Sequence, residues 1–374
     1  MNTLTLLAWE PPEFYTDLVN ALVGSAATFV LLSTVGLMLG LKYYRVLTKP
    51  KVAGPIALLA GFLLFISYKN PQFSTIASLP DNVPIVMMVA SVGFFVWLAF
   101  RQMALNDERL DQGLPPKEAE AKEVEKTFVW PDLVYIEFIC LILFTVFLIL
   151  WSIALKAPLE QPANPAKTPN PSKAPWYFLG LQEMLVYFDP WIAGVVLPTM
   201  IITGLMMLPY IDKNPKGNGY YTFKERKFAI SVYMFGFVVA WVLLIFMGTF
   251  LRGPNWNFFG PYERWDIHKL EPLTNVNLSE LVYLKAFGVG MPRNWFIREF
   301  WGILLLLIYF VVAPGALVRF VPMFRRFYDS MGMVRYSVFI VHLLVMAGMV
   351  IKMLSRWTMN LKYVVAIPEY FFNI

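Results

Sequence analysis

Residues 133–155, LVYIEFICLILFTVFLILWSIAL, decide the fold class, because they run for 23 residues with one charged side chain, Glu137. An apolar run of about 18 residues or more is long enough to cross a bilayer as a helix. Similar runs recur along the 374-residue chain, in which 58% of the residues are hydrophobic and 15% are charged. A soluble domain carries roughly 25% charged residues. The sequence therefore predicts an all-α, polytopic membrane protein.

About eight runs of this kind are expected to cross the bilayer, so both chain ends should lie on the same side. The expected spans are residues 18–41, 52–68, 83–100, 133–155, 190–210, 228–251, 300–318 and 336–351. Four alternate loops hold 18 of the 31 Lys and Arg residues, and such loops face the cytoplasm. Both termini are therefore predicted on the outer, periplasmic side. These loops are residues 42–51, 101–126, 213–227 and 319–335.

Two polar segments divide the spans. Residues 105–127 contain 11 charged residues among 23 and predict a cytoplasmic linker. Residues 252–299 are rich in Pro, Asn and aromatic residues, and Trp and Tyr favour the membrane interface, so this segment predicts an outer-side loop folded against the surface. The expected domains are a three-span region over 1–104, the linker 105–127, a membrane region over 128–251, the outer loop 252–299, and two further spans with a tail over 300–374.

Residue counts exclude several kinds of site. Two haems held by paired histidines need four histidines, whereas the chain has only His268 and His342, expected in a loop and against a neighbouring helix. The single cysteine, Cys140, allows no internal disulfide or thiolate metal site and is expected to be a small buried residue. No metal site is expected. The basic residues flank apolar runs, so the net charge of +6 does not indicate nucleic-acid binding.

Carboxylates at the edges of spans are the candidate functional groups, because charge is costly there. Asp132 and Glu137 stand at the predicted cytoplasmic start of the fourth span, and Glu183 and Asp189 stand at the predicted outer start of the fifth. One carboxylate region near each face suits a protein that handles protons from a membrane-soluble quinone. The alternative is that acidic residues in a first helical turn only complement the helix dipole.

Three blocks carry a family likeness: VWPDLVYIE (129–137), PLEQPANPAKTPNPSKAPWYF (158–178) and GVVLPTMIITGLMMLPYID (194–212). Together they resemble the C-terminal half of cytochrome b, and most of all the split form called subunit IV in cytochrome bf complexes. The resemblance covers roughly residues 127–251, about a third of the chain. It implies a subunit of a quinol:cytochrome c-type oxidoreductase that couples electron transfer to proton translocation and is not catalytic alone.

The family's P-E-W-Y motif lines the quinol-oxidation site on the outer side of the membrane, and the charge count independently places residues 175–183 there. The resemblance therefore implies a quinone pocket that contains Trp176, Tyr177 and Phe178. Here Ala174-Pro175 stands where the family has Pro-Glu, so the motif glutamate is missing. Glu183 lies seven residues after Trp176 and would be about two helical turns, roughly 10 Å, away.

These residues carry the predicted chemistry. Catalytic roles are expected for Glu183, Tyr177 and Glu137, with Trp176, Phe178, Pro175 and Asp132 in the quinone pockets. Asp132 and Glu137 would serve proton uptake at a quinone-reducing site on the cytoplasmic face.

The resemblance implies quinone or quinol as the cofactor and a multi-subunit complex, whose dimeric state stays open. Haem b is expected on a partner, the N-terminal cytochrome b subunit. Further partners are a Rieske iron–sulfur protein, a c-type cytochrome or both, in the lipid bilayer of a bacterial inner membrane. A structural anchor that docks cytochromes without quinone chemistry is the alternative, which the missing motif glutamate favours. A small-molecule transporter is disfavoured because the chain shows no inverted repeat.

Overall fold

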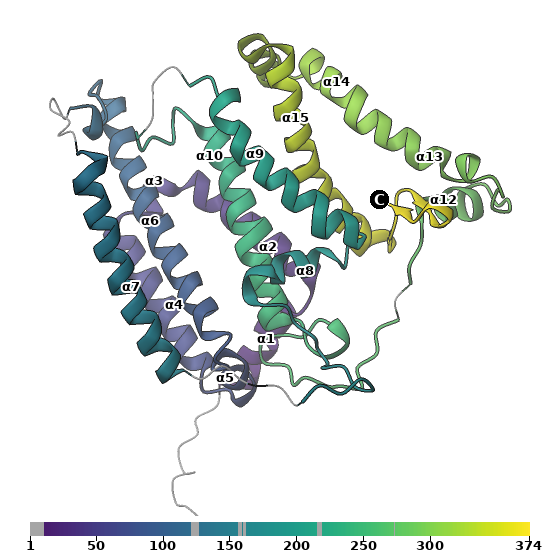
Figure 1. The fold of residues 1–374 in the computed structure, drawn as a ribbon, viewed down its shortest axis with the longest axis horizontal. Helices are drawn as coiled ribbons and strands as arrows, with labels where there is room; N and C mark the ends of the chain where they lie inside the picture. The colour runs from purple at the N-terminus through teal and green to yellow at the C-terminus, as the bar shows by residue number, and fades with distance from the viewer. Residues whose placement is uncertain (1–10, 121–126, 156–158, 160–161, 215–218, 273) are drawn as a thin grey trace, which may run out of the picture. The chain divides into compact units, whose positions relative to one another are not determined.

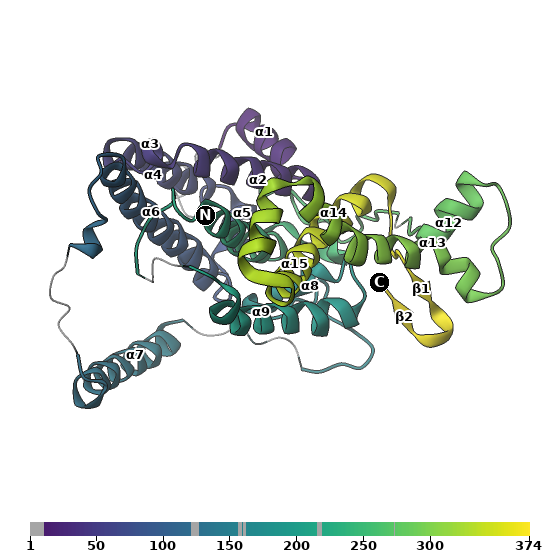
Figure 2. The same cartoon turned by 90° about the horizontal axis from the view of Figure 1, so that it is seen from above.

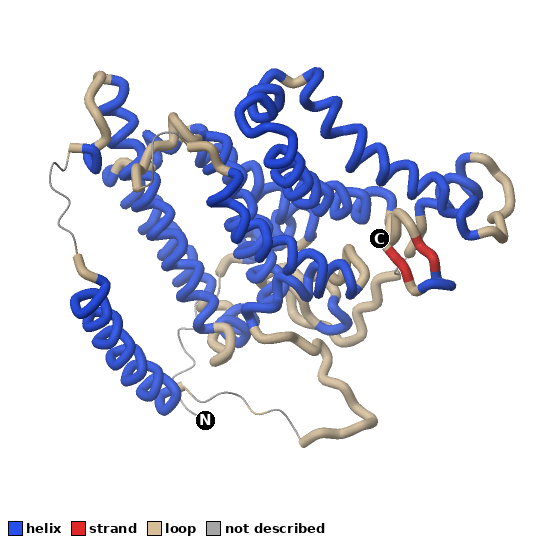
Figure 3. The backbone as a smooth tube through the Cα atoms, turned by 45° about the horizontal axis from the view of Figure 1, so that its top comes forward, coloured by secondary structure: helices blue, strands red, loops and turns tan. Residues whose placement is uncertain are grey.

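The computed structural model describes residues 11–120, 127–155, 159, 162–214, 219–272 and 274–374. Contacts within the chain divide it into two compact units, which are described separately (Figures 1 and 2). Unit 1 comprises Met1–Tyr177 and Asn218–Lys269, and unit 2 comprises Phe178–Gly217 and Leu270–Ile374. Nearly all the regular structure is helical, as Figure 3 shows by colour.

Unit 1 contains the helices of the N-terminal region together with two later membrane segments. Its α-helices are α1 (Glu13–Val23), α2 (Ala26–Lys42), α3 (Tyr44–Leu47), α4 (Pro50–Ser67), α5 (Pro71–Ala77), α6 (Val83–Asp111), α7 (Val134–Ala154), α10 (Lys227–Met234) and α11 (Leu244–Phe246). Its π-helical stretches are η2 (Val129–Leu133), η5 (Phe235–Leu243) and η6 (Met247–Leu251), and its 3-10 turns are η1 (Lys117–Ala119) and η7 (Pro254–Trp256).

Unit 2 is helical except for one short hairpin. Its α-helices are α8 (Leu179–Met184), α9 (Leu197–Ile211), α12 (Leu278–Glu280), α13 (Trp295–Leu307), α14 (Ala313–Phe320) and α15 (Pro322–Met359). Its other helical segments are η4 (Ile192–Val196), η8 (Leu281–Ala286), η9 (Ile308–Val312) and η10 (Pro368–Tyr370). Strands β1 (Ala366–Ile367) and β2 (Phe372–Asn373) pair antiparallel, with Ala366 opposite Asn373.

The polytopic helical prediction is confirmed. Within the described residues, seven helical segments are long and apolar enough to cross a membrane, and α1 with α2 adds an eighth if this pair is one span. The expectation of one continuous first span over 18–41 is wrong, because α1 and α2 meet at 87°. The amide of Gly24 closes α1 on the carbonyl of Asn20, and the Ser25 hydroxyl then accepts from the amide of Thr28, which caps a new helix.

Unit 1 is held at one end by the buried carboxylate of Asp107, near the end of α6. It accepts hydrogen bonds from the Tyr44 hydroxyl at 2.6 Å and from the backbone amides of Phe223 and Lys224 at 3.2 and 3.0 Å. Burial and this bond to the carboxylate raise the pKa of Tyr44, so the phenol remains a donor. The rings of Tyr44, Phe100 and Phe223 pack together beside Ala104. Asp107 thus ties α3, α6 and the segment before α10 into one cluster.

A buried cluster of unit 2 lies where α15 packs on η9 and α14. Tyr336, Ile340 and Leu344 form the buried row, and the Tyr309 hydroxyl donates to the carbonyl of Leu344 at 2.7 Å. In α13, the buried carboxylate of Glu299 accepts from the amide of Ala366 at 3.0 Å. This bond attaches the terminal hairpin to α13.

Gly302 sets how closely α13 approaches the C-terminal segment. A methyl group there would lie 2.1 Å from the carbonyl oxygen of Val364, whereas nothing lies within 4 Å of the same position at Gly315. We expect Gly302→Ala to destabilise the protein by about 1–3 kcal/mol through overpacking. Gly315→Ala is the matched control and should be stabilising by up to about 1 kcal/mol, because alanine favours the helix. Thermal unfolding in detergent, followed by circular dichroism, measures both; equal shifts would contradict the close approach.

Candidate functional site

The segment that leads to the Trp-Tyr-Phe sequence is anchored to other parts of unit 1. Asn170 and Asn255 exchange two hydrogen bonds, in which the Asn255 amide donates to Asn170 Oδ1 at 2.7 Å and Asn170 Nδ2 donates to Asn255 Oδ1 at 2.9 Å. Lys173 Nζ donates to the carbonyl of Thr249 at 2.7 Å and lies 4.8 Å from the ring centre of Trp265. The end of the proline-rich run is therefore attached to the end of η6 and to the segment that follows it.

The Trp-Tyr-Phe residues form the 3-10 turn η3 (Trp176–Phe178), which leads directly into α8. Trp176 is half-buried and meets the ring of Tyr177 edge-on, with 5.7 Å between ring centres. Tyr177 is 50% exposed, Phe178 is 51% exposed, and Pro175 is also exposed. The turn thus presents flat aromatic surface outside the packed interior, which suits an aromatic ligand ring.

Glu183 lies in α8 and is fully enclosed, with 0% of its surface exposed. The Tyr187 hydroxyl donates to Glu183 Oε1 at 3.2 Å, and the Tyr187 ring meets Trp357 of α15 edge-on at 5.8 Å. Since unit 1 ends at Tyr177 and unit 2 begins at Phe178, the structure does not bring Tyr177 and Glu183 into one described site. A continuous α-helix does not join them either, because the stretch begins with a 3-10 turn.

The two carboxylates predicted at the cytoplasmic side lie together on one exposed helix. Asp132 belongs to η2 and Glu137 to the first turn of α7, and both are exposed. No residue of α7 is buried. The expectation that Cys140 is buried is therefore wrong, because no face of this helix is covered by the described parts of the chain.

The histidines have different surroundings. His268 is exposed in a loop. In α15, His342 Nδ1 bonds the carbonyl of Val338 at 2.7 Å, and Nε2 has no hydrogen-bond partner among the described residues. A methyl group on Gly204 of α9 would lie 3.4 Å from this Nε2, so the backbone of α9 passes close to that side of the imidazole ring. No group of three His, Cys, Asp or Glu residues in the described ranges is placed to hold a metal ion.

The match to a known protein family falls in this region. Residues 162–262 match the family described as cytochrome b (C-terminal)/b6/petD. The middle of this chain is similar to the C-terminal part of cytochrome b. The predicted resemblance is confirmed, although the matched range begins later than residue 127 and ends beyond residue 251. It includes Lys173, the Trp-Tyr-Phe turn and Glu183.

Two relatives of this chain match it over similar lengths. A cytochrome b of Allochromatium vinosum is 34% identical over 93 residues, which are 24% of this chain and 22% of that protein. A menaquinol:cytochrome c reductase cytochrome c subunit of Geobacillus thermodenitrificans is 27% identical over 106 residues, 27% of this chain and 42% of that protein. The chain thus spans less than half the length of either relative. No solved structure matches it.

Neither Lys173 nor the Asn170–Asn255 pair was predicted from the sequence. The sequence did contain a signal for Lys173. This lysine stands three residues before Trp176, and the segment over residues 252–299 supplies Trp residues that a cation can contact. The Asn pair gave no signal, because its two residues lie 85 positions apart.

Lys173→Met keeps most of the side-chain length but removes the charge that bonds Thr249 and faces Trp265. We expect the attachment to weaken by about 1–3 kcal/mol, so amide hydrogen exchange over residues 170–178 should accelerate about tenfold or more. Hydrogen-exchange mass spectrometry of the purified assembly measures this change. Lys167→Met, at an exposed position of the same run, is the control. Equal exchange in both variants would show that Lys173 does not anchor the turn.

Proposed function

We propose that this chain is a haem-free membrane subunit of a quinol:cytochrome c-type oxidoreductase, and that residues 175–178 form part of its quinol-oxidation site. The observation that carries the proposal is the turn η3, which presents the exposed rings of Tyr177 and Phe178 within the cytochrome b C-terminal segment. The name of the Geobacillus relative, a menaquinol:cytochrome c reductase subunit, supports the same reaction class.

In this proposal the aromatic residues bind and orient the quinone ring. Trp176 is held edge-on against Tyr177, so the two rings offer surfaces at a fixed angle, and Phe178 adds a third apolar face. Stacking on such rings contributes about 0.5–1.5 kcal/mol beyond the area buried. Pro175 has no titratable group, so it can shape the pocket but cannot accept a proton. Oxidation of quinol to quinone releases two electrons, to an iron–sulfur or c-type acceptor and to haem on a partner, and two protons.

Glu183 is the proposed proton acceptor in place of the missing motif glutamate. Its carboxylate is enclosed, and the Tyr187 hydroxyl donates to it, so we expect a proton to reach it through that hydroxyl. A hydroxyl can accept one proton while it donates its own, and it therefore serves as a relay without changing charge. Positioned carboxylates that transfer protons accelerate reactions by about 10²–10⁴-fold.

The proposal places haem b on a separate cytochrome b N-terminal subunit. His268 is exposed in a loop, and the one histidine within a candidate span, His342, faces the backbone of α9. The exposed Asp132 and Glu137 would serve proton uptake near a quinone-reducing site on the cytoplasmic face, where the partner subunit could reach them. The outward placement of residues 175–183 and a bacterial inner membrane follow from the distribution of basic residues and the family likeness.

A structural anchor without its own quinone chemistry is the second candidate. Pro175 at the motif position and the full burial of Glu183 are the observations that favour it. Inhibitors of outer-site quinol oxidation distinguish the two candidates: loss of turnover in the purified complex on their addition supports the quinol site, and insensitivity supports the anchor.

Glu183→Gln tests the proton role directly. The glutamine carbonyl can still accept from Tyr187, so the fold should persist while the titratable group is lost. We expect quinol-driven cytochrome c reduction to fall roughly a hundredfold, with subunit composition and partner haem spectra unchanged. Tyr187→Phe keeps the ring against Trp357 and should give an intermediate loss.

The control for both variants is Glu13→Gln, at an exposed position of α1. Unchanged turnover in Glu183→Gln would remove this residue from the mechanism.

A further inference from the structure

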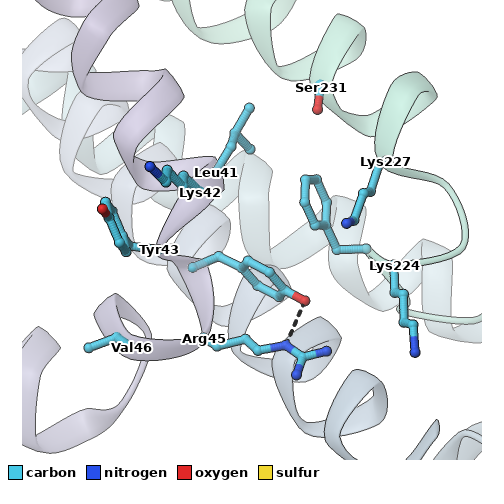
Figure 4. Close-up of a pocket in the computed structure, with 10 residues that line it drawn as sticks. Leu41, Lys42, Tyr43, Arg45, Val46, Lys224, Lys227 and Ser231 are labelled. Atoms are coloured by element: carbon cyan, nitrogen blue, oxygen red, sulfur yellow. Dashed lines mark hydrogen bonds between the residues drawn. The ribbon is translucent and has the colours of Figure 1, made fainter. Parts of the chain in front are cut away.

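A basic cavity lies within unit 1, away from the Trp-Tyr-Phe turn along the chain. Its volume is about 560 Å³, and it opens where α2 ends, α3 begins and the chain enters α10. Lys42 and Arg45 line it from the α2–α3 side, and Lys224 and Lys227 line it from the other. In Figure 4 the Lys42 ammonium points toward Tyr43. Four cations from segments about 180 residues apart in sequence therefore line one cavity.

The charges around this cavity do not cancel. Arg45 and Lys224 both pair with Asp111, each at 2.6 Å, so one carboxylate is shared between two cations. Lys42 and Lys227 form no ion pair with any residue that the structure describes; the Lys42 ammonium lies only over the ring of Tyr43, at 5.2 Å. The lining thus keeps an excess of positive charge that a bound anion would neutralise.

The cavity wall is built by buried contacts. Tyr44 accepts from Arg45 Nε at 3.0 Å and donates to the fully buried Asp107, which also holds the backbone of Phe223 and Lys224. The Arg45 side chain and the backbone of Lys224 are consequently held in place before any ligand arrives. This part of the lining is preorganised and loses less entropy on binding than the exposed side chains of Lys42 and Lys227 do.

The cavity lies at the ends of two candidate membrane helices, and this position indicates the class of ligand. α2 ends at Lys42 and the span Lys227–Leu251 begins at Lys227, so these cations mark the ends of apolar helices. Apolar Leu41 and Val46 share the lining, and the Ser231 side chain lies one turn further along α10. A ligand that combines a phosphate with an apolar tail matches this order. Basic pockets between membrane helices on the cytoplasmic side bind anionic headgroups, and both loops involved are predicted to face the cytoplasm.

We propose that this cavity binds the phosphate of an anionic phospholipid, such as phosphatidylglycerol, with Lys42 and Lys227 as its principal contacts. The acyl chains would run along the apolar lining beside Leu41. Inorganic phosphate shares the charged group but makes no use of that apolar lining, which favours the lipid. The inference does not depend on the quinol site, because its residues lie outside the 162–178 stretch and its readout is lipid binding.

The test uses the purified complex after removal of native lipid. Binding of dioctanoyl phosphatidylglycerol, dioctanoyl phosphatidylcholine and inorganic phosphate is measured by native mass spectrometry and by the shift in thermal unfolding. We expect phosphatidylglycerol to bind at least tenfold more tightly than phosphatidylcholine. The double variant Lys42→Gln/Lys227→Gln should lose about thirtyfold in affinity, since each basic residue near the membrane contributes about 1 kcal/mol.

Two matched variants control for charge and folding. Lys49→Gln/Lys51→Gln removes two exposed lysines of the same loop that do not line the cavity, and it should bind as the unmodified protein does. Lys42→Arg/Lys227→Arg keeps the charges and should retain binding. Equal affinity for the two lipids, equal loss in the Lys49/Lys51 pair, or phosphate binding as tight as that of phosphatidylglycerol would overturn the proposal.

Discussion

One buried carboxylate, that of Asp107, determines how one end of unit 1 is assembled. It is fully buried and satisfied by three donors, of which two are backbone amides more than 100 residues further along the chain. A buried charge is tolerated only when its hydrogen bonds are made, so the segment before α10 has one acceptable position beside α6. The aromatic cluster of Tyr44 and Phe223 and the basic cavity above it both depend on that position.

The spans could be predicted from the sequence because membrane crossing is a property of local composition and length. The break between α1 and α2 escaped prediction, since a glycine–serine pair inside an apolar run carries little weight until the Ser25 cap is seen. The exposure of Cys140 also could not be predicted from its neighbours in sequence, because an apolar residue in a span can face its own chain, a lipid or another polypeptide. The hydrogen bonds of Asp107 could not be predicted, because sequence patterns do not report contacts between distant segments.

The candidate site was predictable in part. The Trp-Tyr-Phe sequence and its proline-rich lead identified the cytochrome b C-terminal segment, and the family model matches there. The burial of Glu183 was not predictable. Helical spacing from Trp176 indicates which face of a helix a residue lies on, but it does not indicate which other segments pack over that face. Its contact with Tyr187, four residues on, follows helical spacing, whereas the role of Trp357 in holding that tyrosine depends on the fold of unit 2.

Helix α7 has a consequence for how this protein can vary. Its candidate span, Val129–Ala154, is 0% buried within the described chain, so its side chains contribute almost nothing to the internal packing of the subunit. Exchanges among leucine, isoleucine, phenylalanine and valine there cost the folded chain little. Any selection on the shape of this helix must act from outside the described chain, through whatever surrounds it. The apolar surface of α7 can thus change with its surroundings, while the interior around Asp107 cannot.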